Sequence, residues 1–245
     1  MAPADADNSR FAFCHPTMHP SLPSAADVIT LHDHLLASAG WPADVPNDAP
    51  APQDQALWLW VLTNHRFNCK LWAEEDLARR TTVGAADIAA NKRAIDGFNQ
   101  ARNDATERVD ELLLITLGLV DAASARTDAP LSTVPAGARL NSETAGSIID
   151  RMSIMALKVH AMRQQTQRVD VDAAHIAAST IKLGRLQQQR ADLGHCLDTL
   201  LGDAKAGRAY FKVYRQFKMY NDARFNPALV AEQATQAARQ AAAKP

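Results

Sequence analysis

The sequence lacks long hydrophobic runs, an excess of either charge and a pattern of paired cysteines. Its longest mostly apolar run, Leu112–Val120, has nine residues, whereas a membrane helix needs about 20, so we expect no membrane span. The 26 basic and 27 acidic side chains give a formal net charge of −1, which argues against a nucleic-acid partner. The three cysteines are far apart and the first residues show no signal-peptide pattern, so we expect a cytoplasmic protein without disulfides.

β-Branched residues are also sparse, no segment alternates with period two, and prolines are absent from two long stretches. No proline lies in 53–129 or 136–226, and eight of the twelve lie between Pro3 and Pro52. Because proline breaks helices, proline-free stretches rich in alanine, leucine, glutamine and arginine are typical of helices. We therefore predict an all-α, multi-helix bundle with no sheet.

The placement of the prolines, together with composition, divides the chain into three parts. We predict a mobile N-terminal tail over 1–23, a helical bundle domain over 24–228, and an Ala/Gln-rich C-terminal tail over 229–245 that frays. The first helix begins at Ser24, which together with Asp27 resembles a capping box. The other predicted helices cover 53–80, 85–120, Ser142 or Thr144 to the residue before Val169, 173–201 and 210–220.

An internal repeat relates the two halves of the predicted bundle. The segments 100–113 and 188–201 share Gln-x-Arg-x-Asp, then an aliphatic residue, then Asp-x-Leu-Leu, with a constant offset of 88 residues. Seven matched positions favour duplication over chance. We therefore predict two duplicated helical hairpins that pack as a bundle and are related by a pseudo-twofold axis.

Three of the predicted long helices carry polar side chains on the face that also carries large apolar residues. A carboxylate on such a face costs several kcal/mol unless it is paired or metal-bound. One interpretation is a network of buried ion pairs and amides that holds the helices in register. The interpretation that we prefer is a polar cleft, with carboxylates for a divalent cation and arginine or lysine for a phosphate. The polar positions are Asn64, Asn68, Glu75 and Arg79; Lys92, Asp96, Asn99, Asn103 and Asp110; and Glu143 and Asp150.

This preference gives each candidate residue a role. Glu75 and Asp150 are the predicted catalytic residues, and Asp96 joins them as a predicted metal ligand, with Mg²⁺ as the possible cofactor. We expect Asp150 to be largely buried and bonded to Arg79 or Arg102. Glu75, Arg79, Asp96, Asn99, Asn103 and Asp150 are expected to converge on a single cleft. The predicted substrate-binding residues are Asn64, Asn68, Arg79, Asn99, Arg102, Asn103, Arg151, Lys158, Tyr214, Arg215 and Lys218.

Aromatic and cationic side chains alternate in the predicted helix 210–220. Tyr214 lies beside Arg215, and Phe217 beside Lys218. Aromatic rings beside cations could hold a sugar ring or a base with its phosphates. The same pattern would arise if a last helix docked its aromatic rings on the bundle and left its cations in solvent, and both interpretations stay open.

The histidines show no metal-binding or catalytic spacing. His32 and His34 flank Asp33 on the amphipathic first helix, and we interpret them as surface or capping residues. His65 shares a helical sector with Trp58 and Cys69, which indicates a core histidine with a hydrogen-bond partner.

Several ordered motifs together are similar to one bacterial family. They are Asn-x-x-Phe-Asn-x-x-Leu-Trp at 64–72, Lys-Arg-x-Ile-Asp-x-x-Asn-Gln at 92–100, Glu-Thr-x-Gly-Ser-Ile-Ile-Asp-Arg at 143–151 and Tyr-Arg-Gln-Phe-Lys-Met-Tyr-Asn-Asp at 214–222. Over about His32 to Pro227 the chain resembles the family called domain of unknown function 4254. The resemblance implies a Gram-negative source and genes that often accompany glycosyltransferases of envelope polysaccharide. It implies no activity.

Three functions are compatible with these observations. The leading one is a cytoplasmic helical protein that binds, or also transforms, an anionic nucleotide-sugar or phosphorylated glycan precursor in envelope polysaccharide assembly. The first alternative is a non-catalytic partner of a glycosyltransferase. The second is a magnesium-dependent nucleotide pyrophosphohydrolase. Glu107 and Asp110 supply half of the acidic pattern of that class, but Ala78 stands where a third acid should follow Glu74-Glu75. Whether the protein is an enzyme is left open.

Overall fold

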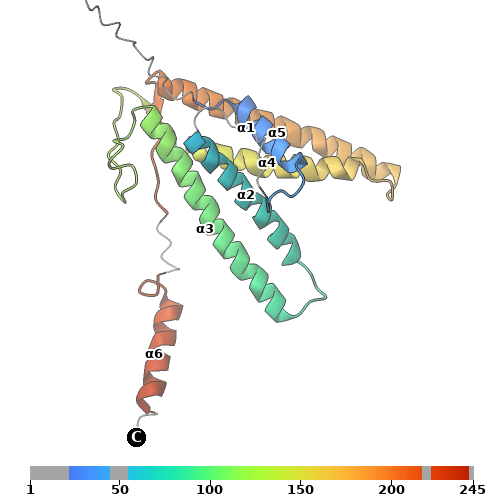
Figure 1. The fold of residues 1–245 in the computed structure, drawn as a ribbon, viewed down its shortest axis with the longest axis vertical. Helices are drawn as coiled ribbons and strands as arrows, with labels where there is room; N and C mark the ends of the chain where they lie inside the picture. Colours follow the sequence, from blue (N-terminus) through green and yellow to red (C-terminus); the bar gives the residue numbers. More distant parts are fainter. Residues whose placement is uncertain (1–21, 45–54, 217–221, 243–245) are drawn as a thin grey trace, which may run out of the picture. The chain divides into compact units, whose positions relative to one another are not determined.

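The computed structural model describes residues 22–44, 55–216 and 222–242. This part of the chain is predominantly helical (Figure 1), which confirms the predicted all-α fold. No helix within it is long and apolar enough to cross a membrane. Its elements are α1 (Ala25–Ala37), α2 (Gln55–Leu77), α3 (Ala85–Thr116), β1 (Arg139–Leu140), α4 (Ala145–Thr166), α5 (Ala173–Lys205), β2 (Ala209–Tyr210) and α6 (Pro227–Ala242).

The chain divides into two compact units, 1–212 and 213–245. The first contains α1 to α5 and the two strands, and the second contains α6. The predicted domain boundaries at 24 and 228 stay predictions. Residues 1–21 of the predicted N-terminal tail lie outside the described residues.

The start of α1 follows the predicted capping pattern. The Ser24 hydroxyl accepts from the Asp27 backbone N–H at 3.2 Å, and the Asp27 carboxylate accepts from the Ser24 N–H at 3.3 Å. The face beyond the cap buries Val28, Leu31 and Leu35. Since α1 contacts α2, α4 and α5, this face forms the centre of the core of the first unit.

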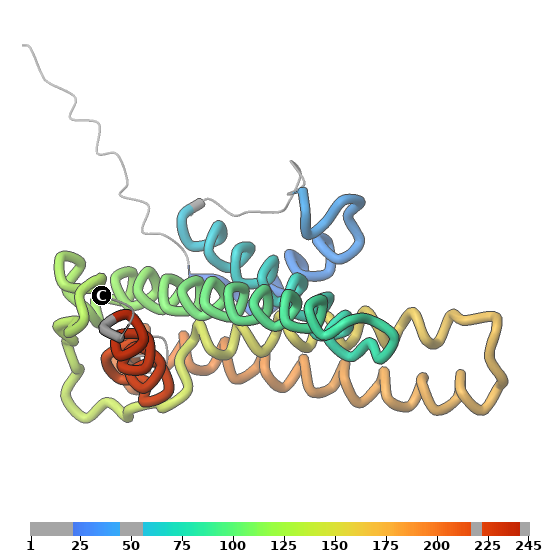
Figure 2. Tube along the Cα trace, turned by 90° about the horizontal axis from the view of Figure 1, so that it is seen from below, coloured from blue at the N-terminus to red at the C-terminus, as the bar shows by residue number. Residues whose placement is uncertain are grey.

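Two helical hairpins, α2–α3 and α4–α5, form the body of the first unit (Figures 1 and 2). Their long second helices begin at Ala85 and Ala173, which is the 88-residue offset of the sequence repeat. A side-chain bond repeats as well: the Gln100 amide donates to Asp104 at 2.5 Å, and the Gln188 amide donates to Asp192 at 2.8 Å. The repeat therefore extends to helix starts and local side-chain bonding.

Burial is uneven along these long helices. In α3 the buried residues begin at Asn103, so 85–102 contributes none. In α5 only Ser179 is buried before Leu193. The core therefore lies where the C-terminal halves of α3 and α5 meet α1, α2 and α4.

The two hairpins lie very close together at the start of α4. The Gly146 N–H donates to the Asp110 carboxylate on α3 at 2.6 Å. Burial raises the pKa of Asp110 to about 7, although hydrogen bonds from the Thr144 hydroxyl and from Gly146 favour its charged form. A glycine is required at 146, because an added Cβ would lie 2.6 Å from the Thr106 carbonyl oxygen and 2.9 Å from the Asp110 carboxyl.

We expect Gly146→Ala to lower the free energy of unfolding by about 2 kcal/mol, because α3 and α4 would have to move apart. The matched control is Gly97→Ala in α3, where an added Cβ meets no atom within 4 Å. That control should raise the stability by about 0.5–1 kcal/mol through helix propensity. Urea unfolding of the two variants measures both changes, and equal effects would contradict the close approach.

Two expectations about the C-terminal part of the chain are wrong. Instead of starting a helix at 210, the chain forms β2, which pairs in parallel with β1, and 211–216 are not helical. Residues 217–221 lie outside the described residues. The predicted lack of a sheet is corrected by this one short pairing. The Tyr210 carbonyl accepts from the Asn141 N–H at 2.8 Å, and Phe211 is fully buried.

The other correction concerns Pro227, which begins α6 where we expected a helix to end and a frayed tail to follow. Proline is favoured in the first turn of a helix, because its fixed φ suits the helix and its missing N–H would have no partner there. The Asn226 side chain accepts from the Ala228 N–H at 3.0 Å and so caps this helix.

Candidate functional site

A cluster of polar side chains around Asp150 joins α2, α3 and α4. The Asp150 Oδ1 accepts from the Asn64 amide at 2.8 Å and from the Asn68 amide at 2.9 Å. The Arg102 Nε lies 3.8 Å from the same oxygen, and the Asp150 side chain is 15% exposed. The prediction that Asp150 is largely buried beside a cation is confirmed, with Arg102 as the partner. Arg79 instead pairs with Glu75.

The cluster continues behind Asp150 through further hydrogen bonds. The Asn64 amide also donates to the Thr106 hydroxyl at 3.1 Å, and the Asn68 amide to the Ser153 hydroxyl at 3.0 Å. The Arg102 guanidinium donates to the Asn103 side chain at 3.2 Å. Because these bonds connect three helices through buried groups, the network fixes the relative register of α2, α3 and α4.

Two stacked histidines extend the cluster into the core. The His65 Nδ1 lies 2.7 Å from the Ser153 hydroxyl, and the His32 ring stacks on the His65 ring with centroids 4.3 Å apart. Burial lowers the pKa of His65 to about 3. Burial, and then the neighbouring His65 and Arg190, hold the pKa of His32 well below its ordinary value. The interpretation of His32 as a surface or capping residue is wrong, whereas that of His65 as a core histidine is confirmed.

An open groove lies beside the Asp150 cluster, between α2, α3 and α4, and is called here the α2–α3 groove. Its volume is about 560 Å³. Asn64, Asn103 and Asp150 are not among its lining residues, but they hydrogen-bond to, or lie beside, Asn68 or Arg102, which line it. Of the predicted site residues, it gathers Asn68, Glu75, Arg79, Asp96, Asn99 and Arg102. Lys92 and Trp72 also line it.

Charges of both signs line this groove. Glu75 and Arg79 pair at 3.0 Å within α2, and Lys92 pairs with Asp96 within α3. All four side chains are substantially exposed, and such surface pairs contribute little to stability. Arg79 and Lys92 can therefore exchange their carboxylate partners for a bound anion at small cost.

A comparison with protein-family models shows to which family this chain belongs. The model described as a protein of unknown function, DUF4254, matches residues 58–213, more than half of the chain. The chain belongs to the DUF4254 family. No curated protein and no solved structure matches it. The resemblance inferred from the motifs is thus confirmed, and the matched region of this DUF4254 protein contains nearly all of α2 together with α3, α4, α5 and both strands.

The predicted metal ligands of the DUF4254 protein do not form a metal-binding group. Within 22–44, 55–216 and 222–242, no three His, Cys, Asp or Glu side chains are grouped so that they could hold an ion. Glu75 pairs with Arg79, Asp96 with Lys92, and Asp150 with amides and Arg102. The α2–α3 groove is lined by three carboxylates, Glu75, Asp76 and Asp96, and by three cations, Arg79, Lys92 and Arg102. This mixture differs from the carboxylate cluster that Mg²⁺ prefers.

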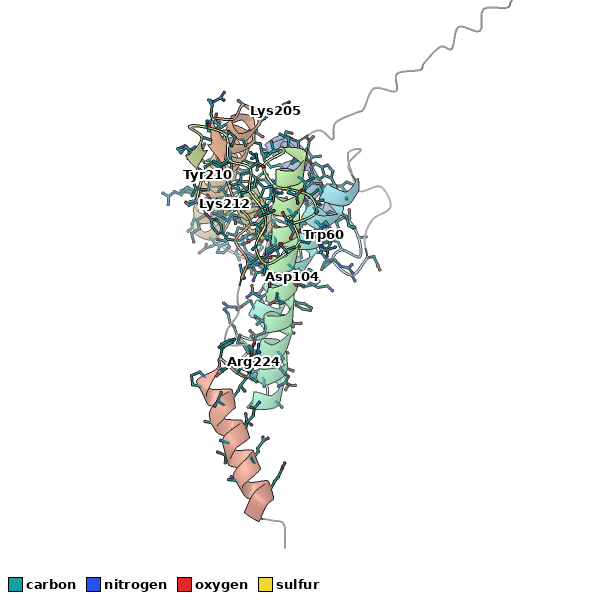
Figure 3. All side chains as sticks on the ribbon, turned by 90° about the vertical axis from the view of Figure 1, so that its left-hand side faces the viewer. Trp60, Asp104, Lys205, Tyr210, Lys212 and Arg224 are labelled. Atoms are coloured by element: carbon teal, nitrogen blue, oxygen red, sulfur yellow. The ribbon has the colours of Figure 1, made fainter. Side chains whose placement is uncertain are left out.

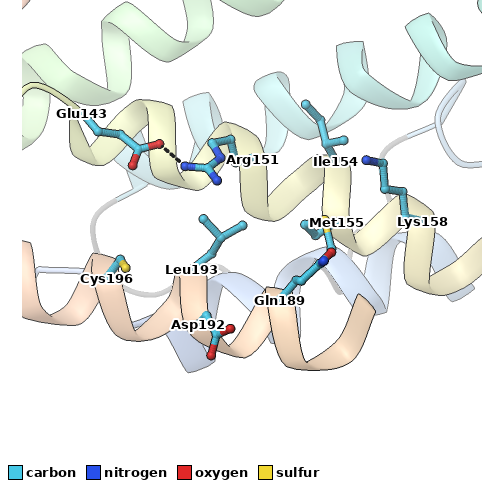
Figure 4. Close-up of a pocket in the computed structure, with 9 residues that line it drawn as sticks. All are labelled: Glu143, Arg151, Ile154, Met155, Lys158, Gln189, Asp192, Leu193 and Cys196. Atoms are coloured by element: carbon cyan, nitrogen blue, oxygen red, sulfur yellow. Dashed lines mark hydrogen bonds and ion pairs between the residues drawn. The ribbon is translucent and has the colours of Figure 1, made fainter. Parts of the chain in front are cut away.

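Other predicted site residues lie elsewhere. Arg151 and Lys158, two of the predicted substrate-binding residues, line a second groove, between α4 and α5 (Figure 4). Tyr214 and Arg215 belong to the second unit, and Lys218 lies outside the described residues. Beyond the end of α5 at Lys205, the Lys212 ammonium lies 5.9 Å from the centroid of the Tyr210 ring (Figure 3).

Proposed function

We propose that this DUF4254 protein binds an anionic nucleotide-sugar or phosphorylated glycan precursor, used in envelope polysaccharide assembly, through the α2–α3 groove. The observation that carries the proposal is the gathering of Arg79, Lys92 and Arg102 around one groove of small-molecule size. Guanidinium groups match the geometry of phosphate oxygens and bind them through two donors at once.

The floor of the groove suits the sugar part of such a ligand. Asn99 carries an amide that can both donate and accept, and it lines the groove together with Asn68. Trp72 is 36% exposed at the rim, where its ring can lie against the apolar face of a sugar. Asp150 supports this floor from behind, because it holds the Asn68 amide and lies beside Arg102.

In this proposal Asp150 acts by positioning groups. Its Oδ1 accepts from the amides of Asn64 and Asn68 and so fixes their orientation. Glu75 is exposed and stays the predicted catalytic carboxylate if the ligand is also transformed. We further propose a cytoplasmic location, in keeping with three widely spaced cysteines.

The test compares ligand-induced thermal stabilisation in two matched double variants. The wild-type melting temperature should rise with the concentration of glucose 1-phosphate and of UDP-glucose. Arg79→Ala/Lys92→Ala should weaken both responses at least tenfold, because charged hydrogen bonds to phosphate are lost. The control Lys182→Ala/Arg185→Ala removes the same charges from exposed positions on α5.

The control variant should respond as the wild type does. Equal responses from both double variants would refute the α2–α3 groove as the site. If a panel of sugar phosphates and nucleotide-sugars, with and without Mg²⁺, gives no stabilisation, the proposal is wrong.

A further inference from the structure

The second groove, called here the α4–α5 groove, has an apolar floor and polar walls (Figure 4). Its volume is about 650 Å³. Met155 and Leu193 form the floor and are almost fully buried, which leaves only a narrow apolar surface facing the opening. A flat apolar ring fits such a floor better than a long hydrocarbon chain does, because a chain would leave the polar walls without partners.

The two walls carry different chemistry. On α4, Arg151 is held by Glu143 at 2.5 Å, and the exposed Lys158 makes no ion pair or hydrogen bond with any described residue. On α5, Gln189 and Asp192 are among the lining residues. The Gln188 amide bonds only Oδ1 of Asp192, which leaves the other carboxylate oxygen able to accept.

The two grooves adjoin on α4. Ile154 lines both of them, Leu157 lines the α2–α3 groove, and Arg151 and Lys158 line the α4–α5 groove. Since neighbouring positions on a helix point about 100° apart, the grooves flank the same stretch of α4 on two sides. A ligand longer than one groove can therefore continue over Ile154 into the other.

From this arrangement we infer that the ligand is a nucleoside diphosphate sugar that occupies both grooves. The inference rests on the proposed function, in which the sugar lies in the α2–α3 groove. The base lies on Met155 and Leu193, and its edge bonds to Gln189 and Asp192. The diphosphate crosses Ile154 between Arg102 on one side and Lys158 on the other.

The charges of the two grooves support placing the base in one groove and the sugar in the other. A diphosphate needs cations along its length, and the α4–α5 groove supplies Lys158 in addition to the three cations of the α2–α3 groove. An amide and a carboxylate together match the donors and acceptors on the edge of a base. A free sugar phosphate would leave this wall unused.

The experiment is calorimetric titration of the full chain with UDP-glucose and GDP-mannose, each compared with its sugar 1-phosphate. At least one nucleotide-sugar should bind about tenfold more tightly than its sugar 1-phosphate. Gln189→Ala/Asp192→Ala, and separately Lys158→Ala, should abolish that advantage and leave sugar 1-phosphate binding unchanged. These side chains are exposed, so the variants should fold, and Lys182→Ala on the exposed surface of α5 is the control.

The possible failures are distinguishable. If sugar 1-phosphates bind as tightly as nucleotide-sugars, or if the α4–α5 variants keep the tenfold advantage, the inference is overturned while the α2–α3 site stands. If neither class of ligand binds the wild type, the proposed function itself is overturned, and the inference with it.

Discussion

Replacing Asp150 by alanine is expected to lower the free energy of unfolding by about 3 kcal/mol, the low end of the range for breaking a buried ion pair. The change leaves the Arg102 charge and the donors of Asn64 and Asn68 without their shared acceptor. The low end applies because Arg102 keeps some access to water, with 26% of its side chain exposed. Urea unfolding at pH 7.5 measures the loss.

Two further variants separate the causes of this loss. Asp150→Asn keeps the shape and one acceptor oxygen but removes the charge, so it should lose less than the alanine variant. Asp96→Ala removes a carboxylate that is 63% exposed and paired only with Lys92 within one helix, and should cost less than 0.5 kcal/mol. An alanine variant at 150 that is as stable as the variant at 96 would show that the cluster contributes nothing to stability.

Acid is expected to destabilise the protein through the stacked histidines. In the unfolded chain both titrate near pH 6.5, whereas in the folded chain the pKa of His65 falls to about 3 and that of His32 lies well below its ordinary value. The unfolded state therefore binds more protons below pH 6.5, and stability is lost as the pH falls from there towards 3. Over this range His65 contributes about 1.4 kcal/mol per pH unit, and His32 adds to the loss in the same direction.

Asp110 acts in the opposite direction. Its pKa is raised to about 7 in the folded state from an ordinary value of 3.8, so the folded state binds the extra proton and stability falls as the pH rises from 4 to 7. One of the two histidine contributions is thus offset. Because two histidines act against one carboxyl, we still expect a net loss of stability between pH 7 and pH 4.5.

Three variants test which titrating group causes each part of the pH dependence of stability. His32→Phe keeps a ring against His65 and removes one titrating group, so its stability should fall more slowly than that of the wild type below pH 6.5. Asp110→Asn should fall more steeply on acidification, because the opposing contribution is gone. His195→Gln, at an exposed position, should follow the wild type. If the slope of His32→Phe matches the wild type, His32 does not change protonation on unfolding.

The helices and their buried faces could be predicted because they depend on residues close in sequence. Proline-free stretches and the 3.6-residue period place Asp150 and Asn64 on the inner faces of their helices, where the structure has them. Periodicity does not set the angle between helices, however. The sequence therefore does not show that Arg151 and Lys158 line a different groove from Glu75, with Ile154 lining both.

Long-range contacts explain part of the remaining errors. His32 follows Leu31 and precedes Leu35 on the buried face of α1, so its helical position already favoured burial over the surface role that we expected. The packing of α1 against α2 then places its ring on that of His65. The segment after Gly207 has a helical composition, but β1, about 70 residues earlier in the chain, provides backbone partners for 209–210. Pairing with a distant strand outweighs such local propensity.

The uneven burial of the long helices also affects how the sequence can vary. The first 18 residues of α3 contribute no buried side chain, and the first half of α5 contributes only Ser179. Insertions or deletions of whole turns near 78–84 or 167–172 would lengthen or shorten a hairpin tip without displacing any core contact. Relatives of this protein can therefore differ in the reach of their two hairpins while they retain the same junction around Gly146.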